Sequence, residues 1–261
     1  MKYMKIDRLQ VFVADSREEM GRLSGHDVAA MIKLLLSVKE ELNVMFAAAP
    51  SQNDVLATLV ADPEIDWSRV NAFHMDEYIG LSRTAPQGFG NFLRRGLFDR
   101  APFGAVHFIN GGADDIAAEC ARYSALIREG VDIVCLGIGE NGHIAFNDPH
   151  EADFDDPLLV KRVSLDEKCR MQQVHDGCFA RIEDVPTHAL TLTIPALMNA
   201  DYHFCIVPAA TKAEAVYRTV YGEIGAHCPA TALRLCPHAA LYVDRDSGAR
   251  LTGFKRGGSA R

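Results

Sequence analysis

The segment 137–149 carries the side chains with the clearest capacity for chemistry. His143 lies in a loop with glycines at 137, 139 and 142, and Asp148 follows five residues later. An imidazole can accept and release a proton near neutral pH, and a nearby carboxylate can orient it. The alternative interpretation is a histidine whose nitrogens are bonded by the backbone of a tight turn. We predict that His143 and Asp148 form a proton-transfer pair.

Two further charged side chains follow other apolar runs. Asp76 comes directly after the run 70–75 and is followed by Glu77. A carboxylate there could be a general base, or it could be an ordinary turn or helix N-cap residue. Lys212 begins a helical pattern, and a cation beside the free N–H groups of a helix N-terminus favours anion binding. Its alternative interpretation is an ordinary solvated lysine.

These residues need a scaffold that brings separate loops together. Strands are expected over 9–14, 43–49, 70–75, 105–110, 131–136, 189–194, 202–207 and 240–243. Helical patterns are expected over 16–36, 54–61, 88–99, 114–128 and 212–220. The alternation predicts an α/β fold, a Rossmann-like, doubly wound, mostly parallel sheet with helices on both faces. Ligands of such sheets bind at the carboxyl ends of the strands, where the candidate residues lie.

The polar segment 157–186 interrupts this alternation and is predicted to be a helical lid over the site. No repeat or linker pattern divides the sequence, so we expect a single α/β domain over 1–254. The tail 255–261 is rich in glycine and basic residues and is expected to be frayed.

Composition narrows the class of protein. A net charge of −8 over 261 residues argues against a nucleic-acid or membrane-surface binder, which usually presents a basic face. Seven cysteines, odd in number and without a Cys-x-x-Cys pair, indicate reduced thiols, and no apolar run has the length of a signal peptide or membrane span. We therefore expect a cytoplasmic protein.

Two cofactor interpretations are weak. The candidate metal ligands His74, Asp76, His143 and Asp148 match no compact zinc signature in their spacing. Glycines 137, 139 and 142 have the spacing of a dinucleotide fingerprint, but His143 follows them where a helix should begin. We expect neither a metal ion nor an organic cofactor.

Three motifs, taken in order, resemble a known family. They are Met75-Asp-Glu-Tyr-Ile-Gly-Leu81, the segment 137–149 and Ala209-Ala-Thr-Lys-Ala213. Together they resemble the glucosamine-6-phosphate deaminase/isomerase family, with a likeness that extends from about residue 9 to residue 245. The resemblance implies a Rossmann-like fold, a sugar-phosphate ligand, and an aldose–ketose isomerisation coupled to loss of an amine.

Roles follow from the resemblance at matching positions. Asp76 would move the proton between C2 and C1 of the open-chain sugar, through an enediol or enolamine. His143, oriented by Asp148, would open the pyranose ring, and Lys212 would hold the phosphate. Asn141 belongs to the same catalytic group. The expected substrate contacts are Ser51, Gln52, Glu77, Gly139, Gly142, Arg170, Gln173 and Lys212.

The sequence departs from the family pattern at several of these positions. Asn141 replaces an aspartate beside the histidine, and Asp148 replaces a glutamate. The phosphate loop, usually rich in Gly and Thr/Ser, is Ala-Ala-Ala-Pro-Ser-Gln over 47–52. An arginine expected in the lid falls at Gln172 or Gln173, with Arg170 nearby as a substitute. A serine pair of the family's allosteric site is absent after 149, so that regulation is not expected.

Two other functions stay open at this stage. The first is a hydrolase similar to the related 6-phosphogluconolactonases, in which His143 would activate water. Those enzymes usually have Asp-Glu-Arg at the positions that match 76–78 and a different run at those that match 145–149. A sugar-phosphate sensor without catalytic activity would not need Asp76, His143 and Asp148 together. Association of copies into a homo-oligomer is possible.

Overall fold

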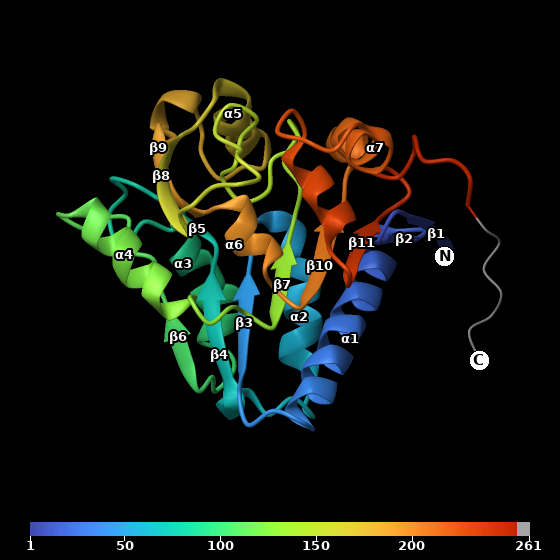
Figure 1. Cartoon of the computed structure of the whole chain (residues 1–261), viewed down its shortest axis with the longest axis horizontal. Helices are drawn as coiled ribbons and strands as arrows, with labels where there is room; N and C mark the ends of the chain where they lie inside the picture. Colours follow the sequence, from blue (N-terminus) through green and yellow to red (C-terminus); the bar gives the residue numbers. More distant parts are fainter. Residues whose placement is uncertain (255–261) are drawn as a thin grey trace.

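A large, mostly parallel sheet forms the centre of the protein (Figure 1). The computed structural model describes residues 1–254, so the predicted frayed tail lies outside the described residues. Within them the sheet has the order β1-β2-β11-β10-β7-β3-β4-β6, and only β1 and β2 pair antiparallel. Its strands are β1 (Lys2–Ile6), β2 (Leu9–Val13), β3 (Leu42–Phe46), β4 (Val70–His74), β6 (Ala105–His107), β7 (Ile133–Leu136), β10 (Tyr202–Val207) and β11 (Ala239–Val243). The predicted fold class is confirmed, and β1 is an addition to it.

Helices cover both faces of this sheet. The helices are α1 (Arg17–Leu36), α2 (Asn53–Ala61), α3 (Phe89–Leu93), α4 (Ile116–Leu126), α5 (Glu167–His175), α6 (Ile194–Met198) and α7 (Ala213–Tyr221). Helix α1 begins where predicted, because the Ser16 side chain accepts a hydrogen bond from the Glu19 N–H. Shorter helical turns are η1 (Pro50–Gln52), η2 (Trp67–Arg69), η3 (Arg94–Phe98), η4 (Ile182–Asp184), η5 (Ala210–Lys212) and η6 (Pro229–Leu235).

Two hydrophobic cores lie on opposite faces of the sheet. Along β7, Ile133 and Cys135 pack in the core that includes α1 and α2, whereas Val134 and Leu136 pack in the core that includes α4 and α7. All four side chains are buried, since successive residues of a strand point to opposite faces. This explains why β7 reads as a continuous apolar run rather than an alternating one.

A second sheet lies near the carboxyl ends of the parallel strands (Figure 1). It has the order β5-β9-β8, with antiparallel pairs, and consists of β5 (Asp76–Tyr78), β8 (Val160–Ser164) and β9 (His188–Leu192). The strand expected over 189–194 therefore exists as β9, but outside the parallel sheet. The segment 157–186 is not purely helical, because it contains the strand β8 before α5 begins. Val160 and Val163 are the buried residues of that strand.

The order of strands locates a crevice. The chain runs outward from β3 through β4 to β6, and then returns to place β7 on the other side of β3. The β3–β7 boundary is therefore the point at which the strand order reverses, where open α/β sheets bind ligands. Among the described residues, none of the helices is long and apolar enough to cross a membrane.

Candidate active site

A cavity lies at the β3–β7 boundary and is walled by segments that are distant in sequence. These walls follow β3, β4, β7 and β10, with α5 on one side and the first residue of α1 on another. Six of the predicted site residues line it, namely Ser51, Asp76, Gly139, His143, Gln173 and Lys212. The fold thus brings together the three motifs that the sequence analysis identified separately.

Asp76 presents a carboxylate without a charge partner to the cavity. It is the first residue of β5 and is buried, with 7% of the residue exposed. Within residues 1–254 its side chain forms neither a hydrogen bond nor an ion pair at the distances that define those contacts. Burial, followed by the neighbouring Glu77 charge, raises the pKa of Asp76 well above its usual value. Once ionised, this carboxylate is a stronger base than an aspartate in water.

His74 holds the backbone that carries Asp76. Its Nε2 accepts a hydrogen bond of 2.9 Å from the Ile109 N–H, so its Nδ1 donates to the Asp76 carbonyl, also at 2.9 Å. Burial lowers the pKa of His74 to about 4, which keeps the ring neutral at physiological pH. With both nitrogens engaged, His74 fixes the junction between β4 and β5 and is not available as a metal ligand.

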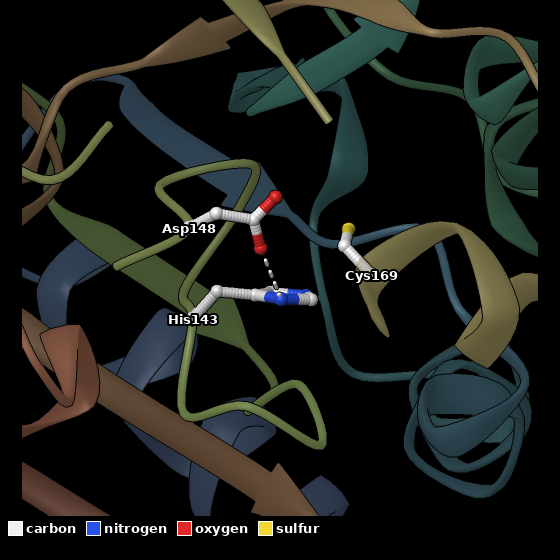
Figure 2. Close-up of side chains that lie close together, drawn as sticks. All are labelled: His143, Asp148 and Cys169. Carbon is white, nitrogen blue, oxygen red and sulfur yellow. Dashed lines mark ion pairs between the residues drawn. The ribbon is translucent and has the colours of Figure 1, made fainter. Parts of the chain in front are cut away.

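His143 and Asp148 come together as predicted, in an unexpected geometry. Asp148 Oδ1 lies 3.0 Å from His143 Nδ1. Figure 2 shows the imidazole edge-on, with the carboxylate over its face. Nδ1 consequently has no hydrogen-bond partner among the residues that the structure describes. The carboxylate therefore contacts the face of the imidazole, and the ring edge remains available to a ligand in the cavity.

Gly139 forms the other side of the imidazole. A side-chain Cβ built at residue 139 would lie 2.1 Å from His143 Cε1 and 2.3 Å from its Nε2. The ring therefore packs directly on the backbone of the glycine loop, which only glycine permits. Gly142 is required for another reason, since its φ of +92° is rarely adopted by other residues.

Asp148 is held by a network below the cavity. Burial acts to raise its pKa, but the contact with His143 and a hydrogen bond from Asn141 lower it below the usual value. Asn141 Nδ2 donates to Asp148 Oδ1 at 2.8 Å, and Asn141 Oδ1 accepts from the His143 N–H at 3.0 Å. Asn141 and Asp148 do not line the cavity themselves; they act through His143.

Cys169 of α5 lies beside this pair (Figure 2). One ligand-type atom from each of His143, Asp148 and Cys169 lies within 4.8 Å of the others. Burial and then the charges of Asp148 and Asp166 raise the pKa of the Cys169 thiol well above its usual value. A neutral thiol is a weak metal ligand, so the donor set favours the metal-free interpretation, which stays a prediction.

The positively charged side chains of the cavity wall are Lys212 and Arg17. Lys212 is 6% exposed, and its Nζ has no hydrogen-bond partner in the described part of the chain. Burial lowers the pKa of Lys212, although the charges of Asp176 and Glu140 act to raise it. Arg17 also lines the cavity, with Nε 2.8 Å from Asp54 Oδ2 and Nη2 2.7 Å from the Pro50 carbonyl. An unpaired buried ammonium beside an arginine is suited to an anion.

Four of the expected substrate contacts lie elsewhere. Glu77 points to the opposite side of β5 from Asp76, where its carboxylate accepts from the N–H groups of Tyr78, Phe89 and Gly90. Successive residues of a strand point to opposite faces, so only one of the two adjacent carboxylates can enter the cavity. Gly142 lies behind the histidine loop, where its carbonyl accepts from Ala230.

Arg170 and Gln52 have structural partners. The Arg170 guanidinium donates to the carbonyls of Ile182 and Val185, so it does not replace the missing lid arginine in the cavity. Gln52 is buried, and its Nε2 donates to the Ile206 carbonyl at 3.2 Å and to Ser51 Oγ at 3.1 Å. It ties the loop after β3 to β10.

Arg17, Asp176 and Ala209 also line the cavity without having been predicted from the sequence, and Gln172 lines it together with Gln173. Ala209 has a φ of +83°, a strained value for alanine that is stabilised because Asp244 Oδ2 accepts its N–H. It directly precedes η5 and marks a forced turn at the anion side. In the sequence Arg17 reads only as the first residue of a helix, and no local signal connects it with a loop thirty residues later.

The chain is similar to known proteins over most of its length. A family model described as glucosamine-6-phosphate isomerases/6-phosphogluconolactonase matches residues 15–241. The chain is 36% identical over 243 residues to the glucosamine-6-phosphate deaminase of Exiguobacterium sp. (strain ATCC BAA-1283 / AT1b), covering 93% of this chain and 92% of that protein. It is 33% identical over 240 residues to the glucosamine-6-phosphate deaminase of Bacillus cereus (strain G9842), covering 92% and 88%.

Solved structures show the same fold. A monomeric glucosamine-6-phosphate deaminase has a TM-score of 0.84 and 28% identity, and the match covers 92% of this chain and 98% of that one. The 6-phosphogluconolactonase of Thermotoga maritima has a TM-score of 0.73 at 20% identity, over 90% of this chain and 98% of that one. The second likeness is one of fold alone.

Proposed function

The chain belongs to the family of glucosamine-6-phosphate isomerases and 6-phosphogluconolactonases, and we propose that it is an enzyme of the deaminase kind. Its reaction converts glucosamine 6-phosphate, or a close analogue, to fructose 6-phosphate and ammonia. The observation that carries the proposal is the meeting of Asp76, His143 and Lys212 in one cavity, each in the segment that follows a different strand of the parallel sheet. An isomerase needs these three functions: a carbon base, a ring-opening acid–base group and an anion site.

The geometry supports a division of roles. His143 removes the proton from the anomeric hydroxyl and returns one to the ring oxygen, which opens the pyranose. Asp76 takes the proton from C2 of the open chain and delivers it to C1. The C2 imine that results is hydrolysed by water to the ketone and ammonia. The raised pKa of Asp76 matches this task, because a more basic carboxylate removes a carbon-bound proton more readily.

Lys212 and Arg17 are the proposed phosphate ligands. They are the lysine and arginine side chains of the cavity wall, and residues 208–212 and 47–51 present backbone around them. Gln173 replaces the lid arginine expected from the family, and Arg170 is engaged elsewhere. Arg17, from the start of α1, is paired with Asp54 through Nε, but it lines the cavity, and its remaining guanidinium N–H groups are the second donor that we propose for this anion site.

We expect Arg17→Gln to raise KM for glucosamine 6-phosphate by about ten- to a hundredfold with little change in kcat. Loss of one hydrogen bond to a charged group costs roughly 1.5–3 kcal/mol, and here it is lost equally in the ground and transition states. Steady-state kinetics with phosphorylated and unphosphorylated glucosamine measure the effect. Arg22→Gln, an exposed arginine of the same helix, is the control. An unchanged KM would remove Arg17 from the phosphate site.

Gly139→Ala is expected to lower kcat by about a hundredfold while the protein stays folded. The new methyl group would overlap His143 Cε1 at 2.1 Å, so the imidazole must move, and a displacement of about 1 Å from reacting geometry can cost that much. Gly112→Ala is the matched control, because a Cβ there would meet its nearest atom at an ordinary 3.6 Å. Equal kinetics for the two variants would contradict the packing role of Gly139.

The direct test of the function uses purified protein with glucosamine 6-phosphate, galactosamine 6-phosphate and unphosphorylated glucosamine. Ammonia and ketose are measured together, and 6-phosphogluconolactone is supplied in parallel. Equal amounts of ammonia and ketose from a phosphorylated amino sugar are the expected result. Lactone hydrolysis alone would identify a hydrolase instead, and binding without turnover of any substrate would identify a sensor.

We also infer a cytoplasmic location. All seven cysteines are free, as expected for a reducing compartment. The possible homo-oligomer stays a prediction, and the similar deaminase structure is that of a monomeric enzyme.

A further inference from the structure

A neutral amide separates two carboxylates beneath His143. Asn141 Nδ2 donates to Asp148 Oδ1 at 2.8 Å and to Asp166 Oδ2 at 3.2 Å. The Asp166 N–H in turn donates to Asp148 Oδ2 at 3.2 Å. The three residues form a closed network, in which the Asn141 amide donates one hydrogen bond to each of the two carboxylates and the Asp166 backbone closes the ring. A carboxylate at position 141 could not do this, since it has no hydrogen to donate.

Asp166 also begins the helix that walls the cavity. Its Oδ1 accepts from the Cys169 N–H at 2.6 Å, so it is the N-cap of α5. Helix α5 places Gln172 and Gln173 in the cavity wall, and Asp176, which follows the helix, lines it as well. A second contact reinforces the attachment, because Gln172 Oε1 accepts from the Glu140 N–H of the histidine loop at 2.8 Å. The lid helix and the catalytic loop are therefore joined at two points.

We propose that Asn141 and Asp166 are positioning residues that latch α5 to the His143–Asp148 pair. The inference rests on the proposed function and deepens it: the enzyme's acid–base pair and its lid are assembled as one unit. The latch requires an amide at residue 141. A neutral side chain that donates hydrogen bonds to both carboxylates allows Asp166 and Asp148 to be charged at this short separation.

A carboxylate at residue 141 would place three acids in contact and disrupt this network. In Asn141→Asp, an oxygen replaces the nitrogen that now lies 2.8 Å from Asp148 Oδ1 and 3.2 Å from Asp166 Oδ2. Like charges at such distances cannot all ionise, so one acid retains a proton to higher pH. The titratable groups that face Asp148 are His143, His150, Asp166 and Cys169.

The reciprocal change distinguishes a latch from three independent residues. Asp166→Asn keeps a capping oxygen for the Cys169 N–H but turns an N–H toward the Asn141 amide, so donor meets donor. In the double variant Asn141→Asp/Asp166→Asn, the amide of residue 166 donates to the carboxylate of residue 141. The network again contains two acids and one amide, but the two acids now meet at the contact between residues 141 and 148, so we expect a partial rescue.

The experiment measures kcat and kcat/KM against pH for the wild type, the two single variants and the double variant. We expect each single variant to lose about tenfold or more in kcat/KM, as for loss of one hydrogen bond to a charged group. In Asn141→Asp the acid limb of the profile moves to higher pH. In the double variant at least about fivefold of the Asn141→Asp loss is restored. Asp115→Asn is the matched control, since Asp115 caps α4 with a 3.0 Å bond to the Ala118 N–H.

Hydrogen exchange of the α5 amides supplies a readout that does not need turnover. Faster exchange in both single variants, with recovery in the double variant, is expected. Losses that simply multiply in the double variant, or α5 exchange unchanged in the single variants, would overturn the latch. An inactive wild type would instead overturn the proposed function, while the exchange data would still decide for or against the latch.

Discussion

Asp76→Asn is expected to lower kcat for glucosamine 6-phosphate by about 10²- to 10⁴-fold, the usual contribution of a general base. Asparagine has nearly the same shape but cannot accept the C2 proton. KM should change little, because Lys212 and the loops that line the cavity remain. Steady-state kinetics, with exchange of the C2 proton into deuterated water as a second measurement, check the result. Glu77→Gln makes the same chemical change on the other side of β5 and is the control.

The same variant should be more stable than the wild type at neutral pH. Burial raises the folded-state pKa of Asp76 above its unfolded value, so the folded protein binds this proton more tightly. As pH rises through the window between the two values, the unfolded chain loses this proton while the folded protein still holds it, so the stability of the fold falls. Asparagine removes that loss. Thermal unfolding measured on both sides of the window would contradict the interpretation if the variant melted lower than the wild type at neutral pH.

In the wild type, the raised pKa also shapes the activity profile. The base form of Asp76 exists only above this pKa, so kcat/KM should fall as pH drops through it. The acid limb should therefore lie above the usual range of an aspartate.

His143→Gln is the second change expected to remove most of the activity, again by about 10²- to 10⁴-fold in kcat. Glutamine cannot transfer protons between the anomeric hydroxyl and the ring oxygen, and it removes the imidazole contact that lowers the pKa of Asp148. Exchange of the C2 proton should persist on the fraction of sugar that opens spontaneously. This separates His143 from Asp76, whose loss removes that exchange.

His26→Gln is the control for this variant. His26 is an exposed residue of α1 and lies outside the cavity. Similar losses in the two histidine variants would show that the effect is general, and full activity of His143→Gln would remove the histidine from the mechanism.

Much of the architecture was predictable because its signals are local. The apolar run 131–136 has side chains buried on both faces of a parallel sheet, which is why the strand could be recognised without its neighbours. The Ser16 cap and the start of α1 likewise depend on residues within one turn. Within the segment 157–186, the strand β8 was not predicted, for the opposite reason. It forms by pairing with β9, which is a contact across more than twenty residues.

The candidate site residues likewise fall into those that local signals predicted and those that depend on contacts between distant segments. Residue types and spacing were enough to predict that Asp76, His143 and Lys212 each follow a buried strand and that glycines shape the histidine loop, because these are local properties. Three other features depend on the folded chain: Glu77 faces away from the cavity, Arg170 is bonded to backbone carbonyls, and Arg17 lines the cavity. Which loops meet depends on the order of strands in the sheet, and that order results from packing among distant segments rather than from any one of them.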